Sequence, residues 1–378
     1  MDIIFFSVAI SFLVAFVSIP LLIKISYTNN LFDFPSVIKS HSYPVSFLGG
    51  IGIFMSVVLS MTITLPSANA VWLQYLLASS ILIFLLGLYD DILFLSPLKK
   101  FIGQLIAIVI IVELGQFQLT SLYGFLGINE MNSLGSHVFT YLTILLIINA
   151  YNLIDGVDGL AGTLALISTV FFGVVFFMNN DPVFAALSFS IAAALAAFLV
   201  FNYTPPKIFL GDTGSLLIGL FNAVLVIRFI NLETSIGSFF HSNSAAAIGF
   251  SVLFIPIIDT IRVMVLRIYR GKSPFVGDQN HIHHMLLKRG YSHIKVTLIL
   301  SIANAFLILF SILFKSIGVT LLVFSMFIIF FSILQLFLIN SEVNGFAENH
   351  LNDSHNSKYL SDKIITPAGE IEETEKKS

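Results

Sequence analysis

The sequence predicts an all-α membrane protein that crosses the bilayer many times. Of its 378 residues, 57% are hydrophobic and only 10% are charged, with a mean hydropathy of +0.96. Soluble domains carry roughly a quarter charged residues, so this chain has too little polar surface to face water. Apolar stretches of about 20 residues, the length that crosses a bilayer core, recur along it. These stretches lack the alternation of apolar and polar residues that barrel strands show. Helices are then the structure that can satisfy the backbone hydrogen bonds in lipid.

Eleven stretches have the length and composition of membrane-spanning helices. Residues 1–340 are expected to form one integral membrane domain. Residues 341–378 are polar, carry both signs of charge and lack apolar periodicity, so we expect a disordered cytosolic tail. Because Asp2 stands where a secretory signal would be basic, the first stretch is interpreted as a permanent span. In chain order the spans are predicted near residues 3–23, 47–65, 71–89, 98–114, 138–154, 160–178, 183–201, 214–230, 245–266, 296–314 and 318–340.

Basic residues are distributed unequally between the two ends of these spans. With the N-terminus outside, only Arg228 and Lys315 fall near the outer side. The positive-inside rule therefore predicts an outer N-terminus and an inner C-terminus. The basic residues that then fall on the inner side are Lys24, Lys39, Lys99, Lys100, Lys207, Arg267, Arg270, Lys272, Lys288, Arg289 and Lys295.

The few acidic, amide and histidine side chains gather at the inner ends of the spans, apart from one aspartate within a span. Such residues near a bilayer are costly and point to function. Their convergence on one face predicts a single active site there. In chain order the groups are Asp90 and Asp91; Asn149, Asn152, Asp155 and Asp158; Asn202 to Asp212; Asp259; and Asp278 with His281, His283 and His284.

The first two groups suit catalysis and sugar binding. Asp90 and Asp91 are adjacent carboxylates that repel each other, so one can act as a base while the other binds a cation. Taken alone, such a pair is more often a solvated helix end. Asn152, Asp155 and Asp158 step by three and would share one helical face. The glycines between them allow a ligand to approach the backbone closely.

Asp212 follows a Pro-Pro turn and opens the next predicted helix, where backbone amides favour an anion. A carboxylate at this place suits Mg²⁺ bound to a diphosphate, because Mg²⁺ is usually held by one or two carboxylates together with phosphates. A helix N-cap is the alternative role for Asp212.

Histidines and a lysine complete the set of candidate ligands. His281, His283 and His284 lack the HExxH pattern of a zinc protease, and basic neighbours make a phosphate cradle more suitable. Lys39 and His41, just before the second span, could hold an anionic headgroup. Ordinary interfacial anchoring is the alternative for these two. The sequence contains no cysteine, which excludes disulfides and thiolate metal sites.

Together, these segments resemble the polyprenyl-phosphate N-acetylhexosamine-1-phosphate transferases, over about Lys39 to Gly290 and in the same order. The family includes the undecaprenyl-phosphate GlcNAc-1-phosphate transferases and the phospho-MurNAc-pentapeptide translocases. The His281-Ile-His283-His284 segment has the form of the GlcNAc branch. Two positions depart from the family: Ser46-Phe47 stands where Pro-Arg is frequent, and Gln279 where a basic residue is common.

The resemblance implies a role for each matching residue. Asp90 matches the base that deprotonates the lipid phosphate, with Asp91 as its neighbour in the motif. Asp212 matches a Mg²⁺ ligand, and Asp91 is expected to share the metal. Lys39, with His41, is expected to bind the lipid phosphate. The nucleotide sugar is expected to contact Asn152, Asp155, Asp158, Asn202, Phe209, His281, His283 and His284, with Phe209 against the uracil.

The implied activity is transfer of N-acetylhexosamine-1-phosphate, with GlcNAc the favoured sugar, from a UDP-sugar to undecaprenyl phosphate. UMP is released in this first membrane step of a cell-surface glycan. The cofactor is Mg²⁺, or Mn²⁺ in its place, and the location is the bacterial inner membrane. Direct attack on the β-phosphorus is favoured, with a covalent aspartyl intermediate left open. No nucleic acid partner is expected, and a homodimer stays open.

Two other classes of protein were considered. A transporter with aspartates in its pathway would carry them near mid-membrane, and many transporter folds contain internal repeats that this sequence lacks. A CDP-alcohol phosphatidyltransferase would carry a DGxxAR signature, but Asp158-Gly159 is followed by Leu-Ala-Gly. Both classes explain the pattern less well than a sugar-phosphate transferase.

Overall fold

A computed structural model describes residues 2–33, 44–65, 71–232, 244–273 and 280–337. The chain divides into one compact unit, Met1–Phe330, and a second unit, Phe331–Ser378. Within the second unit only the end of a helix, residues 331–337, is described. The predicted tail, 341–378, lies outside the described residues, and so do Lys39, His41 and Asp278.

The described residues confirm the all-α prediction. Strands are limited to the short pairs β1 (Phe32–Asp33) with β2 (Val45–Ser46) and β3 (Ser121–Phe125) with β4 (Ile128–Glu130). The helices are α1 (Asp2–Asn29), α2 (Gly49–Thr64), α3 (Val71–Leu93), α4 (Pro97–Val109) with the π-helix η2 (Ile110–Leu114), α5 (Ser133–Ile154), α6 (Leu160–Met178), α7 (Pro182–Asn202), α8 (Gly211–Ile230), α9 (Ala245–Val252), α10 (Phe254–Tyr269), α11 (Ile282–Lys288), α12 (His293–Leu313), η3 (Lys315–Ile317) and a last helix, Val319–Phe337.

Every predicted span is helical in its described part, but the predicted count of eleven spans is not confirmed. In the described part of the chain, eight helices are long and apolar enough to cross a membrane, or nine with the bent α9–α10 pair. That pair turns by 81°. Helix α2 has 16 residues, and α4 has 13 before its π-helical end. Hydropathy reports composition alone, whereas the span count also depends on where a helix bends or stops.

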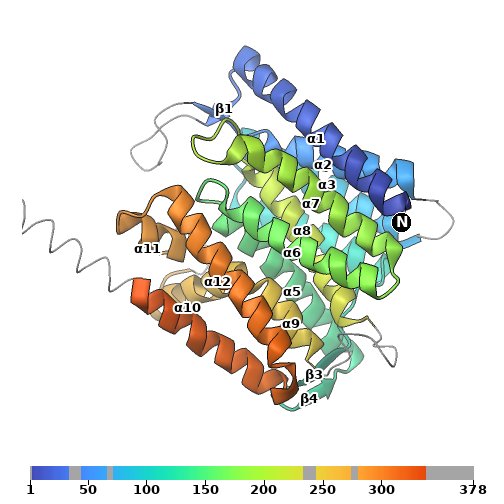
Figure 1. Ribbon diagram of the computed structural model, residues 1–378, viewed down its shortest axis with the longest axis vertical. Coiled ribbons are helices and arrows are strands. Elements are labelled where there is room, and N and C mark those ends of the chain that lie inside the picture. Colours follow the sequence, from blue (N-terminus) through green and yellow to red (C-terminus); the bar gives the residue numbers. More distant parts are fainter. Residues whose placement is uncertain (1, 34–43, 66–70, 233–243, 274–279, 338–378) are drawn as a thin grey trace, which may run out of the picture. The chain divides into compact units, whose positions relative to one another are not determined.

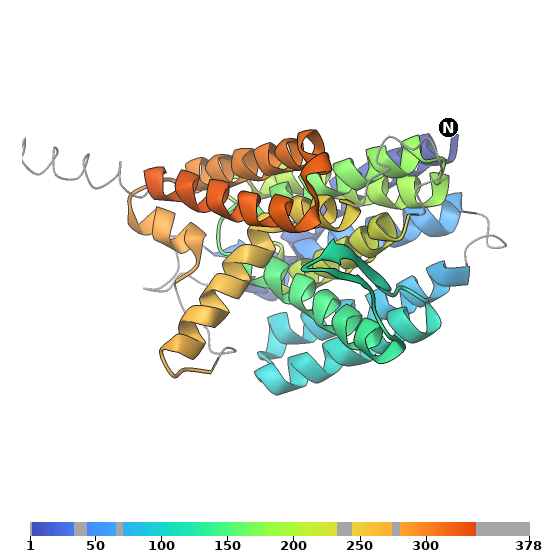
Figure 2. The same cartoon turned by 90° about the horizontal axis from the view of Figure 1, so that it is seen from below.

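Helix α8 forms the centre of the bundle, packed against α2, α3, α5 and α6. In its most apolar stretch 94% of the residues are buried, against 22% in α1. Figure 1 shows α8 between the α1–α2 side and α5, and Figure 2 shows α12 (orange) opposite α3 and α4 (cyan). Gly219 permits this packing, because a Cβ there would lie 2.5 Å from the Ile148 Cα. The middle of α8 is therefore enclosed by its neighbours on several sides.

An ion pair joins the far end of α8 to the start of α7. Arg228 donates from Nε and Nη2 to Asp181 Oδ2, at 3.1 and 2.8 Å, where α7 begins. The guanidinium also lies 5.0 Å from the centre of the Phe184 ring. Asp181 and Arg228 satisfy each other, whereas the candidate site residues gather at the opposite end, where α8 begins.

Candidate functional site

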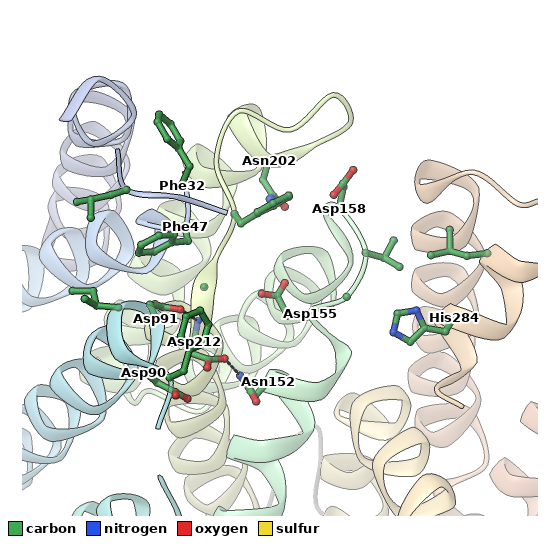
Figure 3. Close-up of a pocket in the computed structure, with 18 of the residues that line it drawn as sticks. Phe32, Phe47, Asp90, Asp91, Asn152, Asp155, Asp158, Asn202, Asp212 and His284 are labelled. Carbon is green, nitrogen blue, oxygen red and sulfur yellow. Dashed lines mark hydrogen bonds between the residues drawn. The ribbon is translucent and has the colours of Figure 1, made fainter. Parts of the chain in front are cut away.

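A pocket of about 860 Å³ opens where α3, α5 and α7 end and α8 begins. Figure 3 shows Asp90, Asp91, Asp212 and Asn152 together on one side, with His284 across the pocket. Lys288 of α11 and Phe47, just after β2, also line it. The predicted site residues that line the pocket are Asp90, Asp91, Asn152, Asp155, Asp158, Asn202, Phe209, Asp212 and His284.

Lys100 joins the polar groups on the α8 side of the pocket. Its Nζ lies 2.8 Å from Asp90 Oδ2 and 3.0 Å from Asp212 Oδ2. The same Nζ donates to Asn152 Oδ1 at 3.3 Å. Lys100 therefore bridges three helices, α3, α5 and α8, from its place in α4. Asp212 turns toward these partners and accepts a hydrogen bond from Asn152 Nδ2, so it does not act as an N-cap.

The sequence analysis counted Lys100 only among the inner basic residues. A signal was present, because Lys100 and Gln104 are polar residues four apart on an otherwise apolar span. They face a matching pair on α5, where Asn149 Nδ2 donates to Gln104 Oε1 at 3.0 Å. Polar residues at helical spacing on two predicted spans indicate that these faces pack together.

Asp91 is bound to the first turn of α8. Its Oδ1 accepts from the Asp212 amide at 2.7 Å, and its Oδ2 accepts from the Thr213 amide and Oγ1 at 2.9 and 2.6 Å. A carboxylate is favourable at this positive end of a helix. Only glycine fits at position 211, which has a φ of +71° and where a Cβ would lie 2.8 Å from Asp91 Oδ2. Asp91 thus ties the end of α3 to the start of α8.

Asn202 holds the rim of the pocket through the backbone. Its Oδ1 accepts from the Gly159 amide at 2.9 Å, and its Nδ2 donates to the Ile208 carbonyl at 2.8 Å. The side chain is buried, so both ends of the amide are used to join α7 to two neighbouring turns. The predicted contact of Asn202 with the nucleotide sugar stays a prediction, and the structure adds this positioning role.

Asp155 follows the last residue of α5 and faces the pocket. Within the described ranges its carboxylate has no hydrogen-bond partner, unlike those of Asp90, Asp91 and Asp212. Burial raises the pKa of the Asp155 carboxyl well above its ordinary value, and the nearby negative charges of Asp212, Asp91 and Asp158 act in the same direction. A cation in the pocket would relieve this repulsion.

Asp158 closes the pocket toward α12. Its Oδ2 lies 3.0 Å from His293 Nδ1 and accepts from Thr204 Oγ1 at 2.9 Å. The backbone carbonyl of Asp158 accepts from Thr297 Oγ1 at 3.0 Å. This carboxylate therefore lies at the pocket edge and also fixes the turn between α5 and α6.

The three predicted histidines do not act together. His284 lines the pocket, whereas His281 and His283 are buried behind it against Asp259. Asp259 Oδ2 lies 3.1 Å from His281 Nδ1 and 3.8 Å from His283 Nδ1. Its Oδ1 accepts from the Ile282 amide and lies 3.0 Å from Arg262 Nη2. Asp259, to which the sequence analysis gave no role, thus anchors the start of α11.

Burial keeps His283 neutral. Its pKa is lowered to about 3, first by burial and then by the charges of His284 and other neighbours. The ring packs directly on the turn after α5, since a Cβ on Gly156 would lie 2.5 Å from His283 Nε2. A direct contact of His281 or His283 with the sugar nucleotide, as the sequence predicted, stays a prediction.

The donor set suits a hard cation. In the described part of the chain, no three His, Cys, Asp or Glu side chains are grouped closely enough to hold a metal ion by themselves. Oxygen atoms of Asp90, Asp212 and Asn152 do surround the Lys100 ammonium. Mg²⁺ prefers oxygen ligands and is often bound by one or two carboxylates plus phosphates. These residues therefore fit Mg²⁺, with water or phosphate oxygens as its remaining ligands.

Comparisons with known proteins agree with this site. Residues 73–230 match glycosyl transferase family 4, a range that contains Asp90, Asp91, Asp155, Asp158 and Asp212. The undecaprenyl-phosphate alpha-N-acetylglucosaminyl 1-phosphate transferase of Haemophilus influenzae is 31% identical over 79% of this chain and 83% of its own. The Escherichia coli K12 enzyme of that name is 28% identical over 86% of this chain and 85% of its own. A probable undecaprenyl-phosphate N-acetylglucosaminyl 1-phosphate transferase of Bacillus subtilis is 30% identical over 89% of this chain and 90% of its own.

Proposed function

The chain belongs to the polyprenyl-phosphate N-acetylhexosamine-1-phosphate transferases, in the undecaprenyl-phosphate GlcNAc-1-phosphate transferase branch, and we propose that it transfers GlcNAc-1-phosphate from UDP-GlcNAc to undecaprenyl phosphate. The observation that carries this proposal is the pocket itself. Five aspartates from α3, α8 and the turn between α5 and α6 line it at one end of a lipid-embedded bundle, and Lys100 of α4 pairs with two of them. A lipid phosphate can reach such a site from the bilayer while a soluble nucleotide sugar enters from water.

In the proposed reaction, an oxygen of the lipid phosphate attacks the β-phosphorus of the UDP-sugar. The new P–O bond forms as the bond between the β-phosphorus and the bridging oxygen breaks, and UMP leaves. Any proton on the lipid phosphate passes to Asp90, which lines the pocket and whose Oδ2 pairs with Lys100. In phosphoryl transfer the protein mainly positions the reactants and neutralises the charge on the phosphates. His284 and Lys288 can contribute to both on the opposite wall of the pocket.

Mg²⁺ is the cofactor we propose, with Mn²⁺ as a substitute. When bound, it would neutralise charge on the diphosphate as the transfer proceeds. Asp212 is the first ligand by position, because its carboxylate points into the pocket while both oxygens of Asp91 face α8. Asp90 and Asn152 supply further oxygen donors beside it. Asp91, which the sequence predicted as a ligand, would then act by holding Asp212 in place.

We propose that the pocket faces the cytosol of a bacterial cell and that the N-terminus lies outside. Lys288 lines the pocket and Lys100 pairs with two of its aspartates, so basic residues gather at this end of the bundle, whereas Arg228 lies at the far end of α8. The chain has no cysteine, so single cysteines at Lys207 and at Ser133 would report the two sides cleanly. In right-side-out vesicles, an impermeant maleimide should label the Ser133 variant and leave the Lys207 variant unlabelled.

The direct test of activity uses purified protein, Mg²⁺, undecaprenyl phosphate and a panel of UDP-sugars, with UMP release as the signal. UDP-GlcNAc should release UMP, and Asp212→Asn should abolish release. The matched control is Asp2→Asn, which changes a carboxylate in α1, on an element that does not line the pocket, and should leave release intact. If no UDP-N-acetylhexosamine releases UMP, the proposed function is wrong. Uptake of a solute into liposomes without UMP release would favour a transporter.

A further inference from the structure

The ammonium of Lys100 lies in the centre of the oxygen cluster in the pocket wall. Its three contacts, Asp90 Oδ2 at 2.8 Å, Asp212 Oδ2 at 3.0 Å and Asn152 Oδ1 at 3.3 Å, equal the number of N–H donors that an ammonium has. The side chain is only 16% exposed. Lys100 thus occupies the place of a cation among oxygen ligands from three different helices.

A lysine is an unusual residue at this place in α4. Position 100 is in the first turn, where the positive end of the helix dipole disfavours a cation. The two carboxylates therefore determine where the ammonium lies, and it in turn offsets their mutual repulsion. The lysine performs a task that a divalent cation would otherwise perform.

A divalent cation and the Lys100 ammonium would compete for these oxygen atoms. A Mg²⁺ ion bonds to oxygen at about 2.0–2.1 Å, closer than the ammonium contacts. At such separations the repulsion between a divalent ion and an ammonium is large even at a high effective dielectric constant. Metal binding to the Oδ2 atoms of Asp212 and Asp90 would therefore push the Lys100 ammonium away from its present position.

We propose that Lys100 is an exchangeable counter-cation that holds the metal-free site together and is displaced when the divalent ion binds. This inference rests on the proposed function for the identity of the ion. The displaced ammonium remains next to the metal, where the anionic oxygens of the substrates are its available partners. Lys100 thereby keeps Asp90 and Asp212 close together before the metal arrives, and it lowers the metal affinity of the empty enzyme.

The test measures Mn²⁺ binding to the purified full chain by electron paramagnetic resonance, without substrates. Lys100→Gln should bind Mn²⁺ about tenfold or more tightly than the unchanged protein, because a competing charge has been removed. Lys99→Gln is the matched control, because Lys99 is the exposed neighbour of Lys100. This variant should bind Mn²⁺ as tightly as the unchanged protein. Asp212→Asn should lose the site. Unchanged or weaker binding by Lys100→Gln, or full binding by Asp212→Asn, would overturn the proposal.

A second measurement does not depend on whether Lys100→Gln folds. Acetylation of the unchanged protein by a lysine-reactive ester, read by mass spectrometry, should modify Lys100 more when saturating Mn²⁺ is present. Lys99 should react equally with and without the metal. If Mn²⁺ leaves the labelling of Lys100 unchanged or lowers it, Lys100 is not displaced and the inference is wrong. Neither measurement uses UDP-sugars, so a failure of the proposed function would appear separately, as absent UMP release.

Discussion

Replacing Asp91 by asparagine distinguishes a residue that holds α8 from one that binds metal. The Asp91 carboxylate receives three hydrogen bonds from Asp212 and Thr213, at 2.6 to 2.9 Å. An asparagine keeps a single oxygen and turns an NH₂ group toward the remaining N–H donors. The variant therefore loses at least one hydrogen bond and the negative charge at the start of the helix.

The expected loss of stability follows from these contacts. A hydrogen bond to a charged group contributes about 1.5–3 kcal/mol, and an anion at a helix N-terminus about 0.3–1 kcal/mol. The free energy of unfolding of Asp91→Asn should therefore fall by about 2–4 kcal/mol. UMP release should fall too, because Asp212 lies in the turn that Asp91 holds.

Thermal unfolding in detergent and Mn²⁺ titration together test this reasoning. Asp91→Asn should melt at a lower temperature than the unchanged protein, while its Mn²⁺ affinity changes by less than tenfold. Asp2→Asn serves as the control for loss of one carboxylate and should melt normally. If Asp91→Asn melted like this control but no longer bound Mn²⁺, Asp91 would be a metal ligand and the tether to α8 would be secondary.

Three further predictions concern the wall behind His284. Gly156→Ala places a Cβ 2.5 Å from His283 Nε2, so it should lower the free energy of unfolding by about 1–3 kcal/mol and reduce UMP release; unchanged melting would contradict this. Asp259→Asn leaves the Arg262 charge without its carboxylate partner and should lower the free energy of unfolding by about 3–5 kcal/mol. The double variant Asp259→Asn with Arg262→Gln should lose less stability than the sum of the losses of the two single variants. The pKa of His283 is about 3 in the folded protein, against 6.5 in the unfolded chain. As the pH falls below 6.5, the imidazole therefore takes up a proton only in the unfolded chain. The free energy of unfolding should then drop by about 1.4 kcal/mol per pH unit, down to pH 3. His283→Gln should therefore lose less melting temperature between pH 7 and pH 5, and an equal loss would show that His283 is not responsible.

The sequence was sufficient to predict the fold class and most of the pocket. Low charge and repeated apolar stretches predicted helices in a bilayer, and the described residues are helical at every predicted span. Polar residues at the ends of those spans predicted a shared site, and nine of the predicted site residues line one pocket. Both predictions succeed because polar groups are costly in the apolar core of a bilayer and therefore lie near the ends of the spans. The position of a polar residue along the chain thus indicates its depth in the membrane.

Other features could not be read from position along the chain. The resemblance to known transferases placed Asp90 beside Asp91 in one motif, yet one carboxylate faces Lys100 and the other faces the amides of α8. His281 and His284 are three residues apart, yet only His284 lines the pocket. The direction of a side chain depends on helix rotation and on the neighbouring element, neither of which residue spacing alone determines.

The amino-acid sequence by itself determined that this protein is helical, embedded in a membrane and polar at one end of its helices. Only the tertiary structure decided which oxygen atoms meet, because α8 must pack against α3 and α5 before Asp212, Asp90 and Asn152 surround Lys100. Hydrophobicity is a property of each residue and sums along the chain. Coordination and hydrogen bonding depend on contacts between distant segments, which exist only once the helices have packed.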